Sequence, residues 1–254
     1  MMSCEYIIVP EHVRALDVGP ATVIVNYRNG RADVLTGPAA RWWEAATTSG
    51  YGDPSGLLDT QSARALREQL LTAELIMQTP RHRAGQPTAV GPSWVPSWGT
   101  QEMQAGRTTV GSASCGMTLR AGVALLVVLG ALAAGQGRSR MARLLRLLTW
   151  ATRRARVDAS ADHLMEAVNA VRRAGTVMPG RVACLEESSA AFLLLAMGRK
   201  RVTWCHGAAA DPVRLHAWVE TDDGQRVAEP SSTARFGVLR AVPERDDGSE
   251  NRRA

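Results

Sequence analysis

The chain has 254 residues, of which 45% are apolar and 21% are charged, and its formal net charge is +6. This length and apolar fraction exclude a disordered chain and allow one large domain or two small ones. A positive charge would suit nucleic acid or an anionic membrane, but the arginines recur between apolar residues and form no basic block. That pattern is typical of solvated helix faces, so we expect no nucleic-acid partner.

The four cysteines, at positions 4, 115, 184 and 205, form no CxxC pair. No charged segment followed by an apolar core opens the chain, so we expect a cytoplasmic protein with reduced thiols. A zinc site built from Cys184, Cys205, His206 and His216 would have no recognised ligand spacing. We therefore expect no metal and no cofactor.

The N-terminal part predicts three strands, at 13–18, 21–27 and 32–36, with a hairpin turn at Asn29-Gly30. Helical spacing of apolar residues follows after Pro38 and again over 61–78, where one or two helices fit. Residues 1–78 are thus expected to form a small α+β module of three strands and two or three helices.

Residues 79–117 are rich in Pro, Gly and Ser and predict a linker or an ordered surface strap, with Trp94, Val95 and Trp98 docking part of it. Three helices are expected after it, within 119–175. The apolar run 121–134 is shorter than the ~20 residues of a spanning helix, so we expect a buried helix rather than a membrane anchor, and whether the run touches a membrane stays open. The last domain is expected over 118–242, and a disordered tail over 243–254.

Cys184 directly precedes a predicted helix over 185–197. The free N–H groups and the positive dipole end of a helix start favour the reactive thiolate, although an isolated cysteine is more often a buried apolar residue. His216 begins a strand over 215–221 that runs into the turn Asp222-Asp223-Gly224. A cysteine at a helix start followed by a histidine on a strand is the order of papain-like and transglutaminase-like sites.

A third group should orient the imidazole of His216. Glu229 lies on the segment 225–230, which is predicted to return as a strand beside His216. Asp222 and Asp223 lie in the turn and should point to solvent, but they remain alternatives. We expect the catalytic residues to be Cys184, His216 and Glu229.

Several of these segments resemble one known family. RVACLEESS (181–189) and LHAWVE (215–220) resemble the nucleophile and histidine motifs of lasso-peptide leader peptidases, and the arginine- and leucine-rich helices over 119–175 resemble their helical lead-in. The N-terminal module resembles the PqqD-like recognition element of ribosomal-peptide maturation, a winged-helix fold of three strands and three helices. The chain thus resembles a fused lasso-peptide B protein. It departs from the family at Glu186-Glu187, where many members have positive or small residues, and at the third catalytic position, which is usually Asp.

The resemblance implies that the N-terminal module binds the leader of a ribosomal precursor peptide as an added strand. The bound leader would lie between the strand 32–36 and the helix near 64–77, against Ala32, Val34, Leu35, Leu66 and Leu70. The C-terminal cysteine peptidase would then cleave the leader from the core. The core would pass to a separate ATP-dependent, asparagine-synthetase-like cyclase.

Three alternatives stay open. A transglutaminase-like acyl transferase would use the same residues, and a non-catalytic peptide-binding scaffold would use none of them. A DNA-binding winged helix is disfavoured, because the segment 61–78 carries Arg64 and Arg67 as its only basic residues, beside Glu68 and Glu74.

Overall fold

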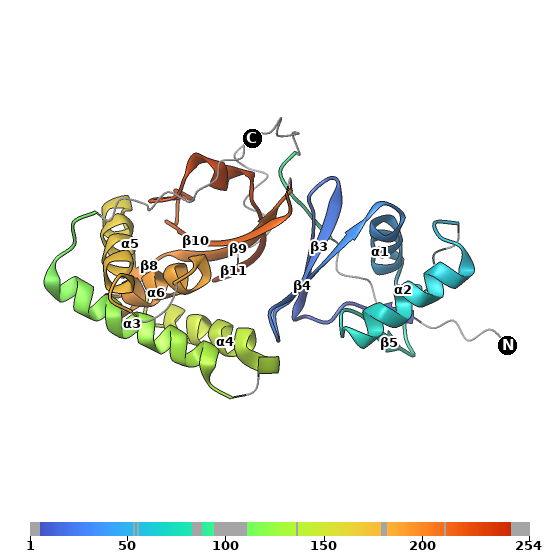
Figure 1. Ribbon diagram of the computed structural model, residues 1–254, viewed down its shortest axis with the longest axis horizontal. Coiled ribbons are helices and arrows are strands. Elements are labelled where there is room, and N and C mark those ends of the chain that lie inside the picture. The colour runs from blue at the N-terminus through green and yellow to red at the C-terminus, as the bar shows by residue number, and fades with distance from the viewer. Residues whose placement is uncertain are drawn as a thin grey trace.

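The computed structural model describes residues 6–52, 54, 56–82, 88–93, 111–135, 137–178, 182–210 and 212–244. The predicted docking residues Trp94, Val95 and Trp98, and the tail after 244, lie outside them. Helices and strands are mixed throughout, so the α+β class is confirmed (Figure 1).

The N-terminal sheet has the order β4-β3-β2-β6. Its antiparallel strands β2 (Val13–Asp17), β3 (Ala21–Asn26) and β4 (Arg31–Thr36) confirm the three predicted strands, and β6 (Ala89–Val90) adds parallel to β2. Gly30 closes the β3–β4 hairpin with a φ of 81°, a left-handed conformation that glycine adopts without strain. The outer edge of β4 ends the sheet.

Two helices, α1 (Gly37–Ser49) and α2 (Thr60–Thr72), cover one face of this sheet. Ile24 of β3 and Trp42 and Trp43 of α1 are at most 1% exposed in their shared apolar cluster. The winged-helix comparison predicted a third helix, but among the described residues between 6 and 82 only α1 and α2 are helical.

The predicted helix over 61–78 is too long. Glu74 takes a left-handed conformation, with a φ of 57°. The Leu75 N–H then donates to the Leu70 carbonyl at 3.0 Å and the Glu74 N–H to that of Leu71, which is the Schellman ending of a helix. The next residues leave the helix as β5 (Met77–Thr79), which pairs with β1 (Tyr6–Ile8), a pair that was not predicted.

The C-terminal half packs helices α3 (Cys115–Ala133), α4 (Arg140–Thr152), α5 (Ala161–Gly175) and α6 (Cys184–Met197) against a sheet of order β10-β9-β11. The strands are β9 (Thr203–Ala209), β10 (Arg214–Glu220) and β11 (Gly237–Val242). The short strands β7 (Val157–Asp158) and β8 (Lys200–Arg201) pair with each other, and η1 (Gly137–Ser139) and η2 (Ser231–Arg235) are 3-10 turns.

The strand predicted to return over 225–230 does not form. Only Arg226 bridges to Glu220 of β10, and the chain then leaves the sheet. Ala228 has a φ of 60° and Pro230 has no N–H to donate, so neither suits a strand interior. Glu229 therefore lies in a loop, and the second neighbour of β9 is β11.

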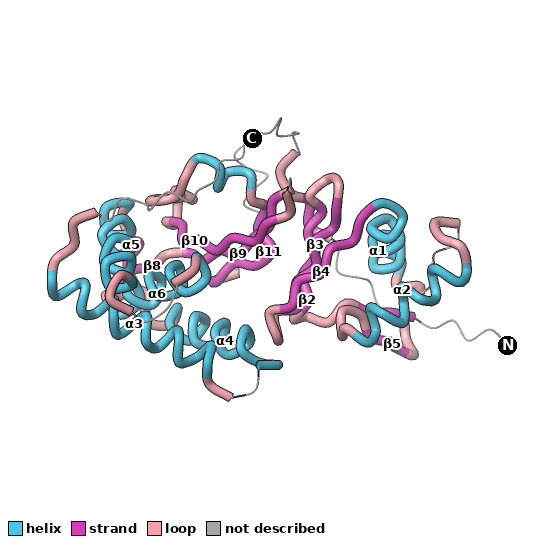
Figure 2. The backbone as a smooth tube through the Cα atoms, viewed as in Figure 1, coloured by secondary structure: helices cyan, strands magenta, loops and turns pink. Residues whose placement is uncertain are grey.

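The second face of the N-terminal sheet packs on the C-terminal half (Figure 2). Leu16 and Val23 belong to the same apolar cluster as Phe192 of α6. Across this contact, the buried Tyr27 hydroxyl hydrogen-bonds the His206 Nδ1 at 2.7 Å. Burial and the charge of His216 lower the pKa of His206 to about 4, so its imidazole is neutral near pH 7.

Tyr27→Phe keeps the ring but leaves the His206 nitrogen without this partner. We expect the free energy of unfolding to fall by about 1–3 kcal/mol, the usual cost of an unsatisfied buried polar group. Urea unfolding measures it, with Tyr51→Phe as the control because that ring is 47% exposed. Equal stability of the two variants would contradict the structural role of this hydrogen bond.

Candidate active site

Cys184 is the first residue of α6, and its side chain is half-buried. Ala183 is the N-cap residue and has no side-chain oxygen to bind the N–H groups of the first turn. Instead, the Glu186 carboxylate accepts from the Ala183 N–H at 3.1 Å. The backbone N–H groups next to the Cys184 thiol therefore remain available to a negatively charged oxygen of a substrate.

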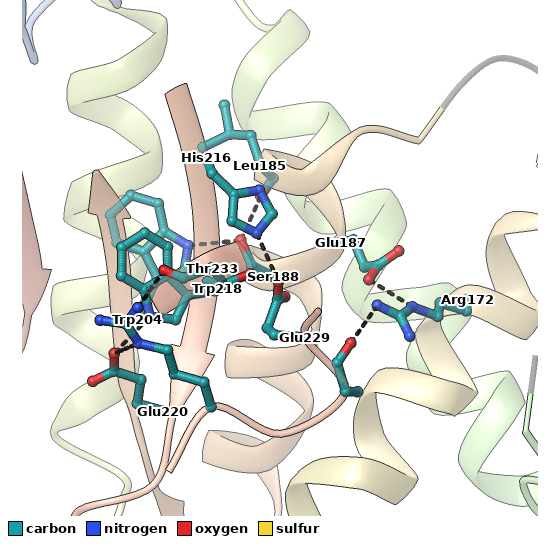
Figure 3. Close-up of polar contacts among 12 residues, drawn as sticks. Arg172, Leu185, Glu187, Ser188, Trp204, His216, Trp218, Glu220, Glu229 and Thr233 are labelled. Atoms are coloured by element: carbon teal, nitrogen blue, oxygen red, sulfur yellow. Dashed lines mark hydrogen bonds and ion pairs between the residues drawn. The ribbon is translucent and has the colours of Figure 1, made fainter. Parts of the chain in front are cut away.

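His216 lies on β10 and connects the thiol to a carboxylate. Its Nε2 lies 2.7 Å from Glu229 Oε2 (Figure 3). The imidazole also interacts with the Cys184 side chain through a hydrogen bond. The structure thus brings together the three residues that the sequence singled out.

The same contacts set the protonation of the pair. Burial raises the pKa of the Cys184 thiol, but hydrogen bonds from His216 and from the Ala217 N–H, with the charge of His216, outweigh it and hold this pKa below its ordinary value. Burial lowers the pKa of His216, but hydrogen bonds to Cys184 and Glu229 and their negative charges raise it to about 9. Both shifts favour a thiolate beside an imidazolium, the reactive state of a cysteine nucleophile.

The alternatives for the third position do not contact the histidine in this way. Asp223 lies in the turn after β10 and accepts hydrogen bonds from Thr221 and, at 2.9 Å, from the Gln225 amide. Among Asp222, Asp223 and Glu229, it is Glu229 that hydrogen-bonds the imidazole. Its position in a loop, and not on a strand, still brings it level with His216.

Side chains that the sequence did not single out hold Glu229. Thr233 of η2 donates to Glu229 Oε2 at 3.0 Å. Arg226 donates to the Thr233 carbonyl and, at 2.9 Å, to Glu220, a carboxylate that is 2% exposed. Trp218 completes this network, because its indole N–H donates to Glu220 and its ring stacks with His216.

Arg172 of α5 anchors the loop from the other side. It donates to Glu187 of α6 at 2.8 Å and to the Ala228 carbonyl at 3.0 Å. This places the residue before Glu229 against the helix that carries Cys184. No local pattern in the sequence marks Arg172 or Thr233, because their partners lie on separate elements.

The sequence contains a second Cys/His pair, Cys205 and His206, which makes other contacts. Cys205 and His206 are neighbours on β9 and face opposite sides of it. Cys205 packs with Trp218 and Phe236, and His206 bonds Tyr27. Within the described ranges, no three His, Cys, Asp or Glu side chains gather as metal ligands.

A groove lies between the free edge of β4 and α2. Its volume is about 630 Å³, and it is lined by four of the residues expected to contact a leader: Val34, Leu35, Leu66 and Leu70. Ala32 is not among the lining residues. Arg31, Asp33 and Glu68 add charges to the groove, so it presents an apolar floor with a polar rim.

A comparison with protein families supports the reading of the C-terminal half. Residues 126–241 match the transglutaminase-like superfamily. They form a transglutaminase-like domain. The matched range contains Cys184, His216 and Glu229, and the superfamily covers both cysteine peptidases and acyl transferases. No curated protein and no solved structure matched the chain.

The thiolate can be tested without a substrate. At mildly acidic pH we expect iodoacetamide to alkylate Cys184 faster than the exposed Cys115, because the pKa of the Cys184 thiol is lowered. His216→Ala should slow the alkylation of Cys184, since losing the hydrogen bond and charge of His216 raises the pKa of the thiol and lowers its thiolate fraction. Peptide mapping by mass spectrometry gives both rates in one sample.

Cys115 is the internal control, and its rate should not change in His216→Ala. If Cys184 and Cys115 showed the same pH dependence in the unaltered protein, the thiolate–imidazolium pair would be wrong.

Proposed function

We propose that this protein is a leader peptidase of lasso-peptide maturation, which binds the leader of a ribosomal precursor peptide and cleaves it from the core. The observation that carries the proposal is the imidazole of His216, hydrogen-bonded to Cys184 on one side and to Glu229 on the other. The free edge of β4, with its groove, supports the choice of an extended peptide as substrate.

In the first step, the Cys184 thiolate attacks the carbonyl carbon of the bond between leader and core. The oxygen of the tetrahedral intermediate takes up the negative charge, beside the N–H groups at the start of α6. His216 donates its proton to the leaving nitrogen, which becomes the new α-amine of the core. The leader remains as a thioester on Cys184.

In the second step, neutral His216 takes a proton from water, and the hydroxide attacks the thioester. The leader leaves with a free carboxylate, and Cys184 and His216 return to the thiolate–imidazolium pair. Glu229 keeps the imidazole in the ring orientation that both steps need, and Thr233 and Arg226 hold Glu229.

Leader recognition is proposed to occur on the groove beside β4. An extended leader can add a strand to the free edge, while Leu66 of α2 and Val34 of β4 contact its side chains. Because the N-terminal sheet is packed on the catalytic half, the groove stays at a fixed distance from Cys184. The released core would pass to an ATP-dependent, asparagine-synthetase-like cyclase in the cytoplasm, where Cys184 stays reduced.

The proposal is tested by incubating the protein with a candidate precursor peptide taken from a short open reading frame near its gene, and following the mass of the peptide. We expect separated leader and core, with one water added, and no cleavage by Cys184→Ala or His216→Ala. Cys115→Ala is the matched control and should cleave normally. Cleavage that persists in Cys184→Ala would refute the peptidase, and a leader joined to an added amine instead of water would indicate an acyl transferase.

The groove is tested by a substitution and not by deletion, because removing residues 1–78 would expose the apolar cluster that both halves share. Val34→Asp places a charge on the groove floor at a side chain that is 46% exposed. We expect KM to rise about tenfold with kcat unchanged, the pattern of lost uniform binding. Met77→Asp, at 49% exposure outside the groove, is the control.

A further inference from the structure

Helix α3 has an apolar face that is exposed in the part of the chain that the structure describes. One stripe of the helix consists of Leu119 and the apolar residues four, seven and eight positions after it, Val123, Leu126 and Val127. The exposed fractions of these four side chains are 74%, 48%, 58% and 45%. The opposite face, with Leu125, is buried. The sequence predicted a buried helix here. The helix does form, but only one of its faces is buried.

This arrangement differs from that of an ordinary core or surface helix. A core helix of this composition is covered all round, and a surface helix has polar residues outside. By length and composition α3 could cross a membrane, yet its inner face packs in the core with α5 and α6. A helix that packs in a domain through one face and exposes a second apolar face is suited to bind an external apolar surface through that second face.

The charge around this face is one-sided. Residues 111–157 contain eight arginines and no Asp, Glu or Lys. The formal charge of this segment is therefore higher than the net charge of +6 of the whole chain. The arginines are Arg120, Arg138, Arg140, Arg143, Arg146, Arg153, Arg154 and Arg156. Arg120 lies beside the stripe on α3, and most of the others lie on or next to α4, the adjacent helix (Figure 1).

Helix α4 also has an exposed face that joins arginines to an aromatic ring. Arg146, Trp150 and Arg153 are exposed at spacings of four and three residues, opposite the buried Leu144 and Leu148. Trp150 is 50% exposed. Tryptophan and long arginine side chains suit the boundary between headgroups and acyl chains, because each joins an apolar part to a polar one.

We propose that the hairpin of α3 and α4 binds the surface of an anionic lipid bilayer, with the α3 stripe in the headgroup region and the exposed Arg120, Arg146 and Arg153 on the phosphates. A second copy of the chain fits this face poorly, because a symmetric pair would set the arginines of one hairpin against those of the other. This inference does not depend on the reaction at Cys184.

Flotation of the full chain with vesicles tests the proposal. The chain should bind vesicles of equal parts phosphatidylglycerol and phosphatidylcholine, bind vesicles of phosphatidylcholine alone far more weakly, and dissociate as salt is added. Arg120→Gln, Arg146→Gln and Arg153→Gln together should weaken binding about 100-fold, at about fivefold for each charge near the surface. Leu119→Gln with Leu126→Gln should weaken it at least about tenfold.

Matched controls separate this face from general effects of charge and apolarity. Val177→Gln with Met197→Gln changes side chains that are 82% and 53% exposed elsewhere, and Arg41→Gln, Arg81→Gln and Arg199→Gln together remove three exposed charges outside the hairpin. Both controls should bind nearly as the unaltered chain does, and circular dichroism should show all variants folded.

Three results would overturn the proposal. The first is equal binding to vesicles with and without phosphatidylglycerol. The second is binding that survives in both hairpin variants. The third is that the unaltered chain does not bind vesicles but forms a concentration-dependent dimer, or a complex with an acidic protein, and that the leucine variant abolishes this association.

Discussion

The imidazole of His216 is held on both sides, by a thiol and by a carboxylate 2.7 Å away, and three separate elements position these groups. The start of α6 brings Cys184, β10 brings His216, and the loop before η2 brings Glu229. Because Glu229 comes from a loop, its position depends on Thr233 and on the contact of Arg172 with the Ala228 carbonyl. A buried network, and not a strand, therefore fixes the third member of the site.

The N-terminal and C-terminal halves, which composition separates as modules, share one apolar cluster and the hydrogen bond between Tyr27 and His206. His206 in turn lies on β9, the strand that pairs with the His216 strand. The groove beside β4 and the reactive pair are thus parts of one packed body. Under the proposed function, a leader in the groove is presented to Cys184 by a fixed frame rather than by a flexible tether.

Local patterns were enough to predict the strands around Asn29-Gly30 and the placement of Cys184 and His216, since a hairpin turn and a helix start are signalled by adjacent residues. Glu229 was identified although its predicted strand is absent, because the contacts of Thr233 and Arg172 bring the loop to His216 in place of strand pairing. The end of α2 at Glu74 was missed, since a left-handed glutamate carries no sequence signal. The exposure of the α3 stripe was missed too, because an apolar run is the same in sequence whether one face or both are covered.

The protonation of His216 tests the account most directly. Nitrogen-15 shifts of its imidazole, measured by NMR across a pH titration, report the charge on both ring nitrogens. The account predicts an imidazolium through neutral pH that loses its proton at a pKa of about 9. A histidine that is neutral at pH 7 and titrates near the ordinary value of about 6.5 would contradict the thiolate–imidazolium pair.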